Sequence, residues 1–341
     1  MAEAWHSEVL RGLLAGEHLS FEQARDLFNS IMDGQLNDAQ IAGVLVALVA
    51  KGEQVQEIAG AAEAMRSHAL RIDTGGLEVI DTCGTGGTGL ATFNISTTAA
   101  LVAAGAGARV AKHGNRTATR PSGSADVLAE LGVNLDADAA TLLRCLQQAN
   151  VCFCFAVKHH PAMRYAAPIR KALGVRTVFN VLGPLTNPAG AKRQLMGVFD
   201  GRLVEKIASV LLTLGSVRAM VVHAEDGLDE FSTTGSTAVA EVKDGGIRTW
   251  QVVPEQFGLE RATLADLAVS TTKESAQRLR GVLEGKIGPD RDIVLLNAGA
   301  ALAVADMTAD LAEGLALARK SIDSGAAKAT LDKLVAASNG R

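Results

Sequence analysis

The sequence lacks the strong basic excess that general DNA- and RNA-binding proteins carry. Lys and Arg number 33 against 37 Asp and Glu, which gives a formal net charge of −4 over 341 residues. We therefore expect no nucleic-acid partner, and any anion site must be a local arrangement of residues. The composition is 48% hydrophobic and 21% charged, which is typical of a globular protein with a sizeable core. The length favours about two domains.

Long apolar segments and a disulfide framework are missing too. The N-terminus has no basic start followed by an unbroken apolar core, so we expect no secretory signal. No run is long and charge-free enough to span a bilayer. Cysteine occurs only at Cys83, Cys145, Cys152 and Cys154, which is too few for a disulfide scaffold. Cys152 and Cys154 would share one face of a buried strand, where core packing is favoured over a metal pair. These features predict a cytoplasmic protein with no membrane partner.

Residues 1–72 carry helix signals and no strand signal. Ser20 and Gln23 have the spacing of a capping box, Asn37 can cap the next helix, and Gly52 can end it. That helix has an almost continuous apolar side, which is more than three short helices can bury among themselves. We therefore expect a small helical domain whose surplus apolar surface is covered by the rest of the chain or by a second subunit in a homodimer.

After residues 74–76 the pattern changes to strands that alternate with helices. This order predicts an α/β domain over 73–341, with a mostly parallel, mixed sheet covered by helices. In such sheets, ligands bind beyond the carboxyl ends of the strands. Strands are expected at 77–83, 108–113, 151–157 and 217–224, helices at 94–106, 124–131, 293–306 and 312–325, and an antiparallel hairpin turning at 244–246.

Two features that suit an anion follow the first of these strands. Residues 84–87 read Gly-Thr-Gly-Gly, which lets successive N–H groups surround an anion, although a tight strand-to-helix turn fits equally well. The segment matches neither the dinucleotide fingerprint nor the nucleoside triphosphate loop. A helix start rich in hydroxyl and amide groups comes next, at Thr92, Asn94, Ser96 and Thr97. One such residue would be an ordinary N-cap, but the cluster beside a glycine turn favours phosphate.

A compact basic segment, Lys-His-Gly-Asn-Arg at residues 112–116, follows the second strand. A solvated surface loop is the alternative, but the segment leaves a buried strand at the same edge of the sheet. Gly123 and Ser124 then open another helix, whose N-terminus offers a second anion site. The density of these features within residues 81–126 predicts a ligand with several phosphates, and therefore an enzyme.

Two charged features lie later in the chain. Asp229 and Glu230 follow the strand at 217–224, and Mg²⁺ is often held by one or two carboxylates together with substrate phosphates. Acidic pairs are otherwise usually surface charge. Arg170 can bind a planar carboxylate through two hydrogen bonds. Arg176 is a second candidate, and a surface salt bridge fits the composition equally well.

Taken in order, these segments resemble the anthranilate phosphoribosyltransferase family of glycosyltransferases. The matching segments span nearly the whole chain and are GTGG, TFNIST, KHGNR, GSAD, HPAMR, RKALGVRTVFNVLGPLTNP and DGLDE. The resemblance implies a Mg²⁺-dependent pentosyltransferase of tryptophan biosynthesis. Such an enzyme joins anthranilate to 5-phosphoribosyl 1-pyrophosphate (PRPP) and releases pyrophosphate. It also implies a homodimer formed through the helical domain, and that part of residues 165–190 packs on that domain.

The resemblance further assigns roles to single residues. Gly84, Asn115 and Arg170 would contact anthranilate. Ser96, Asp229 and Glu230 would bind Mg²⁺. No acid or base is assigned, because the aryl amine is neutral at pH 7, and positioning and stabilisation of the leaving pyrophosphate would supply the rate. PRPP would be held by Gly84, Gly87, Thr88, Thr92, Asn94, Ile95, Ser96, Thr97, Lys112, His113, Gly114, Asn115, Arg116, Thr117, Ala118, Thr119, Arg120 and Ser124.

The chain departs from the family's pattern at a few positions. Thr88 replaces the Asp that usually follows the glycines, which removes a carboxylate near the pyrophosphate and its metal. Arg120 replaces a usual serine and adds a candidate phosphate contact, while Pro121 stiffens that loop. Tyr165 stands where a histidine is common.

Two rival hypotheses stand beside this interpretation. A pyrimidine nucleoside phosphorylase would have a similar fold, use inorganic phosphate and need no magnesium, but the KHGNR and RKALGVRTVFN segments argue against it. A non-catalytic paralogue that binds nucleic acid would carry a basic groove and a decayed site. The acidic balance and the presence of Asn115, Arg170 and the Asp229–Glu230 pair argue against that second hypothesis.

Overall fold

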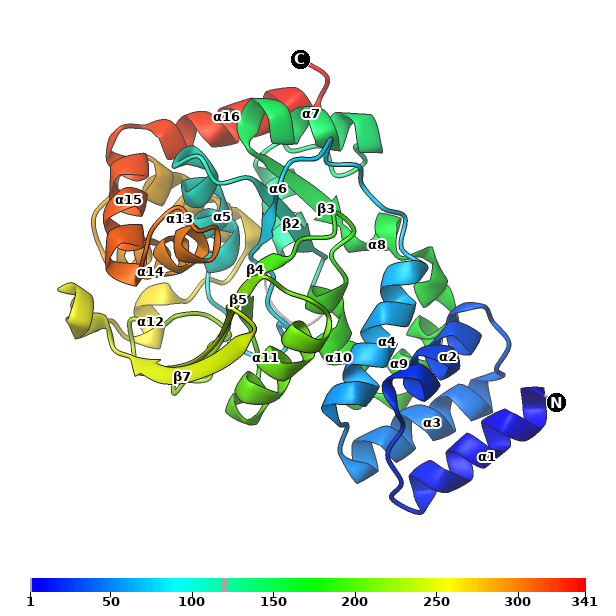
Figure 1. The fold of residues 1–341 in the computed structure, drawn as a ribbon. Coiled ribbons are helices and arrows are strands. Elements are labelled where there is room, and N and C mark those ends of the chain that lie inside the picture. Colours follow the sequence, from blue (N-terminus) through cyan, green and yellow to red (C-terminus); the bar gives the residue numbers. More distant parts are fainter. Residues whose placement is uncertain (1, 118–121) are drawn as a thin grey trace.

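The computed structural model describes residues 2–117 and 122–341, and the side chains from residue 5 onward. Four helices form a bundle at one end of the molecule (Figure 1), namely α1 (Ala2–Leu14), α2 (Phe21–Met32), α3 (Asp38–Lys51) and α4 (Val55–Ser67). The predicted capping box of α2 is confirmed, since Gln23 N–H donates to Ser20 Oγ at 3.2 Å and Ser20 N–H to Gln23 Oε1 at 2.9 Å. Asn37 caps α3 in the same way, and the helix ends at Gly52.

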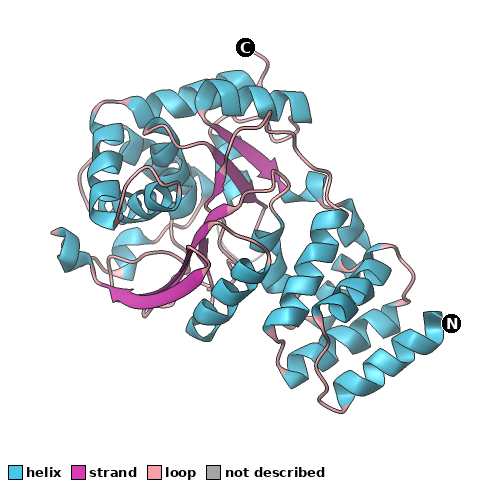
Figure 2. Cartoon of the chain, in the orientation of Figure 1, coloured by secondary structure: helices cyan, strands magenta, loops and turns pink. Residues whose placement is uncertain are grey.

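A seven-stranded sheet with the order β3-β2-β1-β4-β5-β6-β7 forms the centre of the rest of the chain (Figure 2). All pairs from β3 to β5 are parallel, whereas β6 and β7 are antiparallel. The mostly parallel, mixed sheet predicted from the sequence is therefore confirmed. The strands are β1 (Ile80–Asp81), β2 (Val110–Gly114), β3 (Val151–Phe155), β4 (Arg193–Gly197), β5 (Arg218–Ala224), β6 (Thr237–Lys243) and β7 (Gly246–Val252).

Three details of the sheet bear on the predictions. β1 is much shorter than the predicted strand at 77–83, because the chain leaves the sheet at its functional loop. β4 was not predicted, since RQLMG has neither alternation nor β-branched residues, and its pairing with β1 and β5 defines it. The β6–β7 hairpin turns as predicted. Asp244 and Gly245 have φ of 52° and 74°, the positive values that a type I′ turn requires.

Helices cover both faces of the sheet (Figure 1). One face packs mainly against α5, α7, α13, α14 and α16, and the other against α11 and the N-terminal bundle. The helices outside the bundle are α5 (Ile95–Gly105), α6 (Ser124–Glu130), α7 (Ala139–Ala149), α8 (Ala156–His159), α9 (Ala167–Leu173), α10 (Phe179–Leu182), α11 (Val204–Thr213), α12 (Leu264–Leu267), α13 (Thr272–Leu283), α14 (Pro289–Val304), α15 (Leu311–Asp323) and α16 (Ala326–Ser338).

The bundle shares its core with the sheet. Alternate residues of β5 point to opposite faces, so Ala219 and Val221 join the core of α2–α4 while Met220 and Val222 join the opposite core. Ile169 and other apolar residues of the 162–185 segment also belong to the bundle's core. The rest of the chain therefore covers part of the bundle's surplus apolar surface.

Two expectations about cysteine and membranes can be compared with the fold. Cys83, Cys145, Cys152 and Cys154 are free thiols. The Sγ atoms of Cys152 and Cys154 lie 3.8 Å apart inside the core, as their shared strand face predicted. Among the described residues, no helix has the length and apolarity needed to cross a membrane.

Candidate active site

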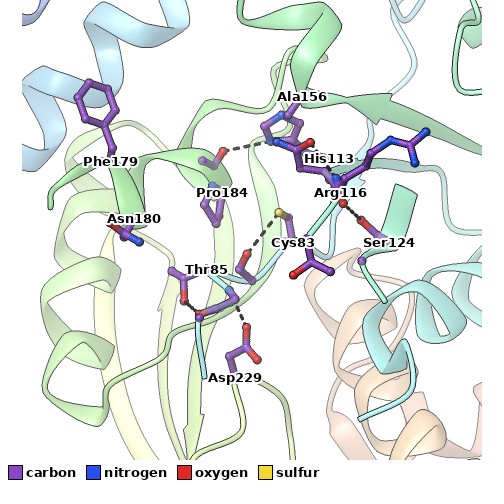
Figure 3. A pocket seen from close by; sticks show the side chains of 18 of the residues that line it. Cys83, Thr85, His113, Arg116, Ser124, Ala156, Phe179, Asn180, Pro184 and Asp229 are labelled. Atoms are coloured by element: carbon purple, nitrogen blue, oxygen red, sulfur yellow. Dashed lines mark hydrogen bonds between the residues drawn. The ribbon is translucent and has the colours of Figure 1, made fainter. Parts of the chain in front are cut away.

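A cavity of about 1120 Å³ opens beyond the carboxyl ends of β1, β2 and β5 (Figure 3). Phe179 and Asn180 of α10 lie on one side, Arg116 and Ser124 on the other, and Asp229 at a third position around it. The predicted residues that line it are Gly84, Gly87, Thr92, Asn94, Ile95, Ser96, Lys112, His113, Gly114, Asn115, Arg116, Thr117, Ser124, Arg170, Asp229 and Glu230.

A few predicted site residues lie elsewhere. The Thr97 side chain is buried, and its hydroxyl donates to Asn94 Oδ1 at 2.8 Å. Thr88 stands beside the cavity lining, where its hydroxyl accepts the N–H of Leu90 at 3.3 Å. Ala118, Thr119 and Arg120 lie outside the described residues, as does Pro121.

The glycine-rich turn is held from below by β4 and by the acidic loop. Thr85 N–H donates to Gly197 O at 2.9 Å, and Gly86 N–H donates to Asp229 Oδ2 at 2.8 Å. A Cβ at Gly84 would lie only 2.8 Å from Asp229 Oδ2, so a larger residue there would displace the carboxylate. Gly86 and Gly87 have φ of 62° and 76°, which favours glycine at both positions.

Arg176 also contacts the glycine-rich turn. Its Nη2 donates to Gly87 O at 2.8 Å, and its guanidinium lies 4.2 Å from the centre of the Phe199 ring. Arg176, which the sequence suggested as a second candidate for binding a carboxylate, is therefore hydrogen-bonded to the backbone of the turn.

The N-terminus of α5 faces the acidic pair. Asn94 occupies the N-cap position but makes no capping hydrogen bond, because its Oδ1 accepts the Thr97 hydroxyl instead, while its Nδ2 group donates to Ser122. Ser96 N–H donates to Glu230 Oε1 at 3.2 Å. Thr92 lies ahead of the helix in a bridge with Ala268, so its predicted place in the helix start was wrong. An ordinary N-cap, the alternative interpretation of these residues, is therefore absent at Asn94. The start of α5 lines the cavity without a side-chain cap.

The basic segment is part strand and part loop. Residues 112–114 pair with β3, so Lys112 and His113 lie in the second strand, within its predicted range of 108–113, and only Asn115 and Arg116 lie in the loop. The Lys112 ammonium is buried and donates to Thr82 O at 3.0 Å and Ser96 Oγ at 3.3 Å. Arg116 in the following loop pairs with Asp126 of α6 at 3.0 Å. The Lys112 ammonium is therefore fixed between Thr82, which precedes the glycine turn, and Ser96 at the start of α5.

Two buried imidazoles lie deep in the cavity. The rings of His113 and His160 are 5.1 Å apart. His113 Nδ1 lies 3.0 Å from Gly183 O and so carries its proton. Burial lowers the pKa of His113 to about 3 and that of His160 to about 4, so both rings are neutral at pH 7.

Arg170 of α9 projects a half-buried guanidinium into the cavity, 5.3 Å from the centre of the Phe179 ring. Desolvation lowers its pKa from the ordinary value. Within residues 5–117 and 122–341, the guanidinium makes no hydrogen bond or ion pair. A desolvated cation without a counter-ion is costly unless a ligand supplies one.

Several lining residues were not singled out from the sequence, among them His160, Met163, Arg164, Phe179 and Asn180. The HPAMR and TVFN segments contain them, so the signal was present. Local pattern did not show that these segments fold over the same cavity, because the contact joins residues far apart in the chain.

Comparisons with known proteins agree with this geometry. Residues 76–328 match the glycosyl transferase family, a/b domain, and residues 7–69 match the helical bundle domain of that family. The anthranilate phosphoribosyltransferase of Laribacter hongkongensis is 52% identical over 331 residues, 97% of each chain. That of Thioalkalivibrio sulfidiphilus is 51% identical and covers 96% of this chain and 97% of its own.

Solved structures give the same result. The crystal structure of anthranilate phosphoribosyltransferase from Thermus thermophilus matches with a TM-score of 0.92 and 42% identity, over 97% of this chain and 99% of its own. The enzyme from Saccharomyces cerevisiae in complex with PRPP and Mg matches with a TM-score of 0.88 and 30% identity, over 99% of each chain.

Proposed function

The chain belongs to the glycosyl transferase family of the anthranilate phosphoribosyltransferases, and from this premise we propose how its own residues bind the two substrates. Its activity is the Mg²⁺-dependent transfer of the phosphoribosyl group of PRPP to the amine of anthranilate, a step of tryptophan biosynthesis. Identity over the full length decides between this activity and the nucleoside phosphorylase and non-catalytic alternatives.

The guanidinium of Arg170, which has no ion-pair partner among the described residues, is the observation that best supports the acceptor site. Anthranilate is a planar ring with an adjacent carboxylate and amine. Arg170 offers two parallel N–H donors to the carboxylate, and Phe179 offers an apolar surface beside it. Asn115 and Gly84 line the same cavity. We therefore propose that Arg170 orients anthranilate so that its amine points toward the glycine turn.

The phosphates of PRPP would lie between the glycine turn, the start of α5 and the 112–117 segment. The N–H groups of residues 84–87 and the helix start supply partial positive charge. The Lys112 ammonium, fixed by Thr82 and Ser96, lies within the same wall. These groups are already in place, so they can stabilise charge as it develops without reorganising.

The acidic loop fits a magnesium ion. Asp229, Glu230 and Ser96 provide oxygen donors, the ligand type that Mg²⁺ prefers, and the Ser96 hydroxyl keeps a lone pair beyond the one facing Lys112. When bound, the ion would neutralise negative charge on the pyrophosphate. The backbone of Ser96 and Gly86 holds the two carboxylates in position.

The protein's contribution to the reaction is positioning and charge stabilisation. The amine of anthranilate is neutral at pH 7 and forms the new C–N bond as the bond to pyrophosphate breaks. The described side chains near the cavity include neutral imidazoles at His113 and His160, but no role as a base is needed, and we assign none. Orientation of two bound substrates can account for a large part of the rate.

We also propose the larger organisation of the enzyme. Residues 1–72 would form the helical domain with part of 165–190, and residues 73–341 the catalytic domain. A homodimer would form through the helical domain, because Ala42, Val46 and Val49 repeat along one side of α3, with Val46 45% and Val49 40% exposed. Four free cysteines fit a reducing, cytoplasmic location.

Replacing Arg170 by Ala tests the acceptor site. Loss of a charge-assisted, two-pronged hydrogen bond costs about 1.5–3 kcal/mol, so the KM for anthranilate should rise about 10- to 100-fold, while the KM for PRPP should change less than about 3-fold. Lys171→Ala is a matched control, because Lys171 is an exposed cation on the same helix. Equal anthranilate KM values in Arg170→Ala and in the control would overturn the assignment.

A further inference from the structure

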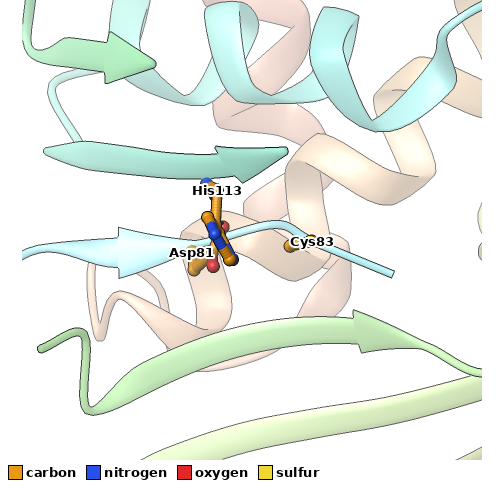
Figure 4. Close-up of side chains that lie close together, drawn as sticks. All are labelled: Asp81, Cys83 and His113. Atoms are coloured by element: carbon orange, nitrogen blue, oxygen red, sulfur yellow. Dashed lines mark hydrogen bonds between the residues drawn. The ribbon is translucent and has the colours of Figure 1, made fainter. Parts of the chain in front are cut away.

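A second group of metal-type ligands lies at the cavity, next to the acidic loop (Figure 4). Asp81 is the last residue of β1, Cys83 lies two residues further along in the loop, and His113 comes from the neighbouring strand β2. One ligand atom from each of the three residues lies within 4.8 Å of the others. Cys83 and His113 also line the cavity, so an ion could reach them from solvent.

His113 is set up as a ligand by its second nitrogen. Its Nδ1–H donates to Gly183 O at 3.0 Å, the kind of contact that orients metal-binding imidazoles and raises their basicity. Its Nε2 is buried and has no hydrogen-bond partner among the described residues, and the residue is only 3% exposed. Burial lowers the pKa of His113 to about 3, so Nε2 offers a lone pair at neutral pH.

Asp81 and Cys83 each retain capacity for one more interaction. The Asp81 carboxylate accepts from Thr82 N–H at 2.7 Å, His113 N–H at 3.1 Å and Asn187 Nδ2 at 2.7 Å. A carboxylate has about four acceptor positions, which leaves about one. In the described part of the chain, the Cys83 thiol makes only a long contact of 3.6 Å to Gly84 O.

We propose that Asp81, Cys83 and His113 form a binding site for one thiophilic divalent cation of the Zn²⁺ or Co²⁺ class. Carboxylate, thiolate and imidazole are ligands that Zn²⁺ accepts, and three protein ligands with a fourth position open to the cavity is a common arrangement for it. Mg²⁺ takes oxygen ligands instead. The site therefore differs in chemistry from the one at Asp229 and Glu230.

The groups around this site determine how many protons are released and which charges are balanced when an ion binds. Burial raises the pKa of the Cys83 thiol above its ordinary value, so each ion that binds displaces one proton from sulfur into water. The resulting thiolate and the Asp81 carboxylate supply two negative charges against the ion's two positive ones. The positive charge of the Lys112 ammonium, which donates to Thr82 O, repels the bound ion. The affinity for the ion is therefore lower than that of a closed structural zinc site.

The test is a titration of the full chain with Co²⁺ in the presence of saturating Mg²⁺, followed by near-ultraviolet absorption. Bonds between thiolate and Co²⁺ give a charge-transfer band that oxygen ligands do not give. One equivalent of Co²⁺ should produce this band in the wild type and in Cys145→Ala, which removes a buried thiol outside the cluster. The band should be lost in both Cys83→Ala and Cys83→Ser.

Two results would overturn the proposal. One is the absence of the band in the wild type at saturating Co²⁺. The other is a band that persists in Cys83→Ala and Cys83→Ser, which would assign the metal to the Cys152–Cys154 pair or to another thiol. Circular dichroism of each variant confirms that a lost band does not reflect a lost fold.

Discussion

Arg170 and His160 show how burial determines what a side chain in the cavity can do. The residue type of Arg170 was enough to suggest carboxylate binding, but a salt bridge on the surface fitted the sequence equally well. The structure separates the two, because the guanidinium is desolvated and has no ion-pair partner in the described part of the chain. His160 was not singled out, since one histidine in a segment of mixed polarity carries no signal of its own.

Acid should destabilise the protein through His160. Its pKa of about 4 in the folded chain lies below the ~6.5 of an unfolded chain. The unfolded state therefore binds more protons between these values, so stability present above about pH 6.5 is lost as the pH falls toward 4. Between pH 7 and pH 5 the wild type should lose about 1–2 kcal/mol more unfolding free energy than His160→Phe.

Urea unfolding at the two pH values measures this difference. Asp81, whose pKa burial raises to about 6, acts in the opposite direction: its contribution is present below pH 3.8 and is lost as the pH rises through 6. Because Asp81 is present in both proteins, its effect cancels. The same pH dependence in wild type and variant would show that His160 is not held neutral.

At the scale of elements, the acidic loop depends on two neighbours that the sequence did not connect to it. Asn297 of α14 is fully buried, accepts Phe231 N–H at 2.9 Å and donates to Phe231 O at 2.8 Å. Gly197 of β4 lies so close that a Cβ would fall 1.7 Å from Asp229 O. The sequence predicted α14 but not β4. Neither sequence pattern could show that these elements contact the acidic loop, because the loop is distant from them in the sequence.

Replacing Asn297 by Leu should loosen the loop that carries Glu230. The change leaves the buried N–H and C=O of Phe231 without partners, which costs about 2–4 kcal/mol. We also expect the Mg²⁺ concentration for half-maximal activity to rise several-fold. Leu302→Ala on the same helix is the control, since it removes buried volume and lowers stability but keeps both hydrogen bonds between Asn297 and Phe231.

Activity titrated with Mg²⁺ distinguishes positioning from stability. If Leu302→Ala shifts the Mg²⁺ requirement as much as Asn297→Leu does, the effect comes from general destabilisation, and the positioning role of Asn297 is wrong.

At the scale of the whole molecule, alternation of strands and helices was enough to predict the fold class, and the hairpin turn followed from Asp-Gly-Gly. How the helical bundle meets the sheet could not be predicted. The shared core joins Ala219 and Val221 of β5 to residues of α2–α4, and such pairing depends on shape complementarity between distant segments. The cavity forms where those segments meet, so its composition was only partly predictable.

The exposed side of α3 leads to a prediction about assembly. In sedimentation velocity at micromolar concentration, the wild type should be a dimer, and the double variant Val46→Glu with Val49→Glu should shift to monomer because charges oppose burial. Val217→Glu is the matched control, since Val217 is 49% exposed on the catalytic domain. A monomeric wild type, or equal dissociation in both variants, would contradict a dimer through α3.

Transfer to anthranilate is measured directly by the loss of anthranilate fluorescence when the purified chain is mixed with PRPP, with and without Mg²⁺. We expect a Mg²⁺-dependent loss in the wild type that is strongly slowed in Arg170→Ala at the same anthranilate concentration. No loss at any Mg²⁺ concentration, in folded protein that still binds PRPP, would contradict transfer to anthranilate at this site.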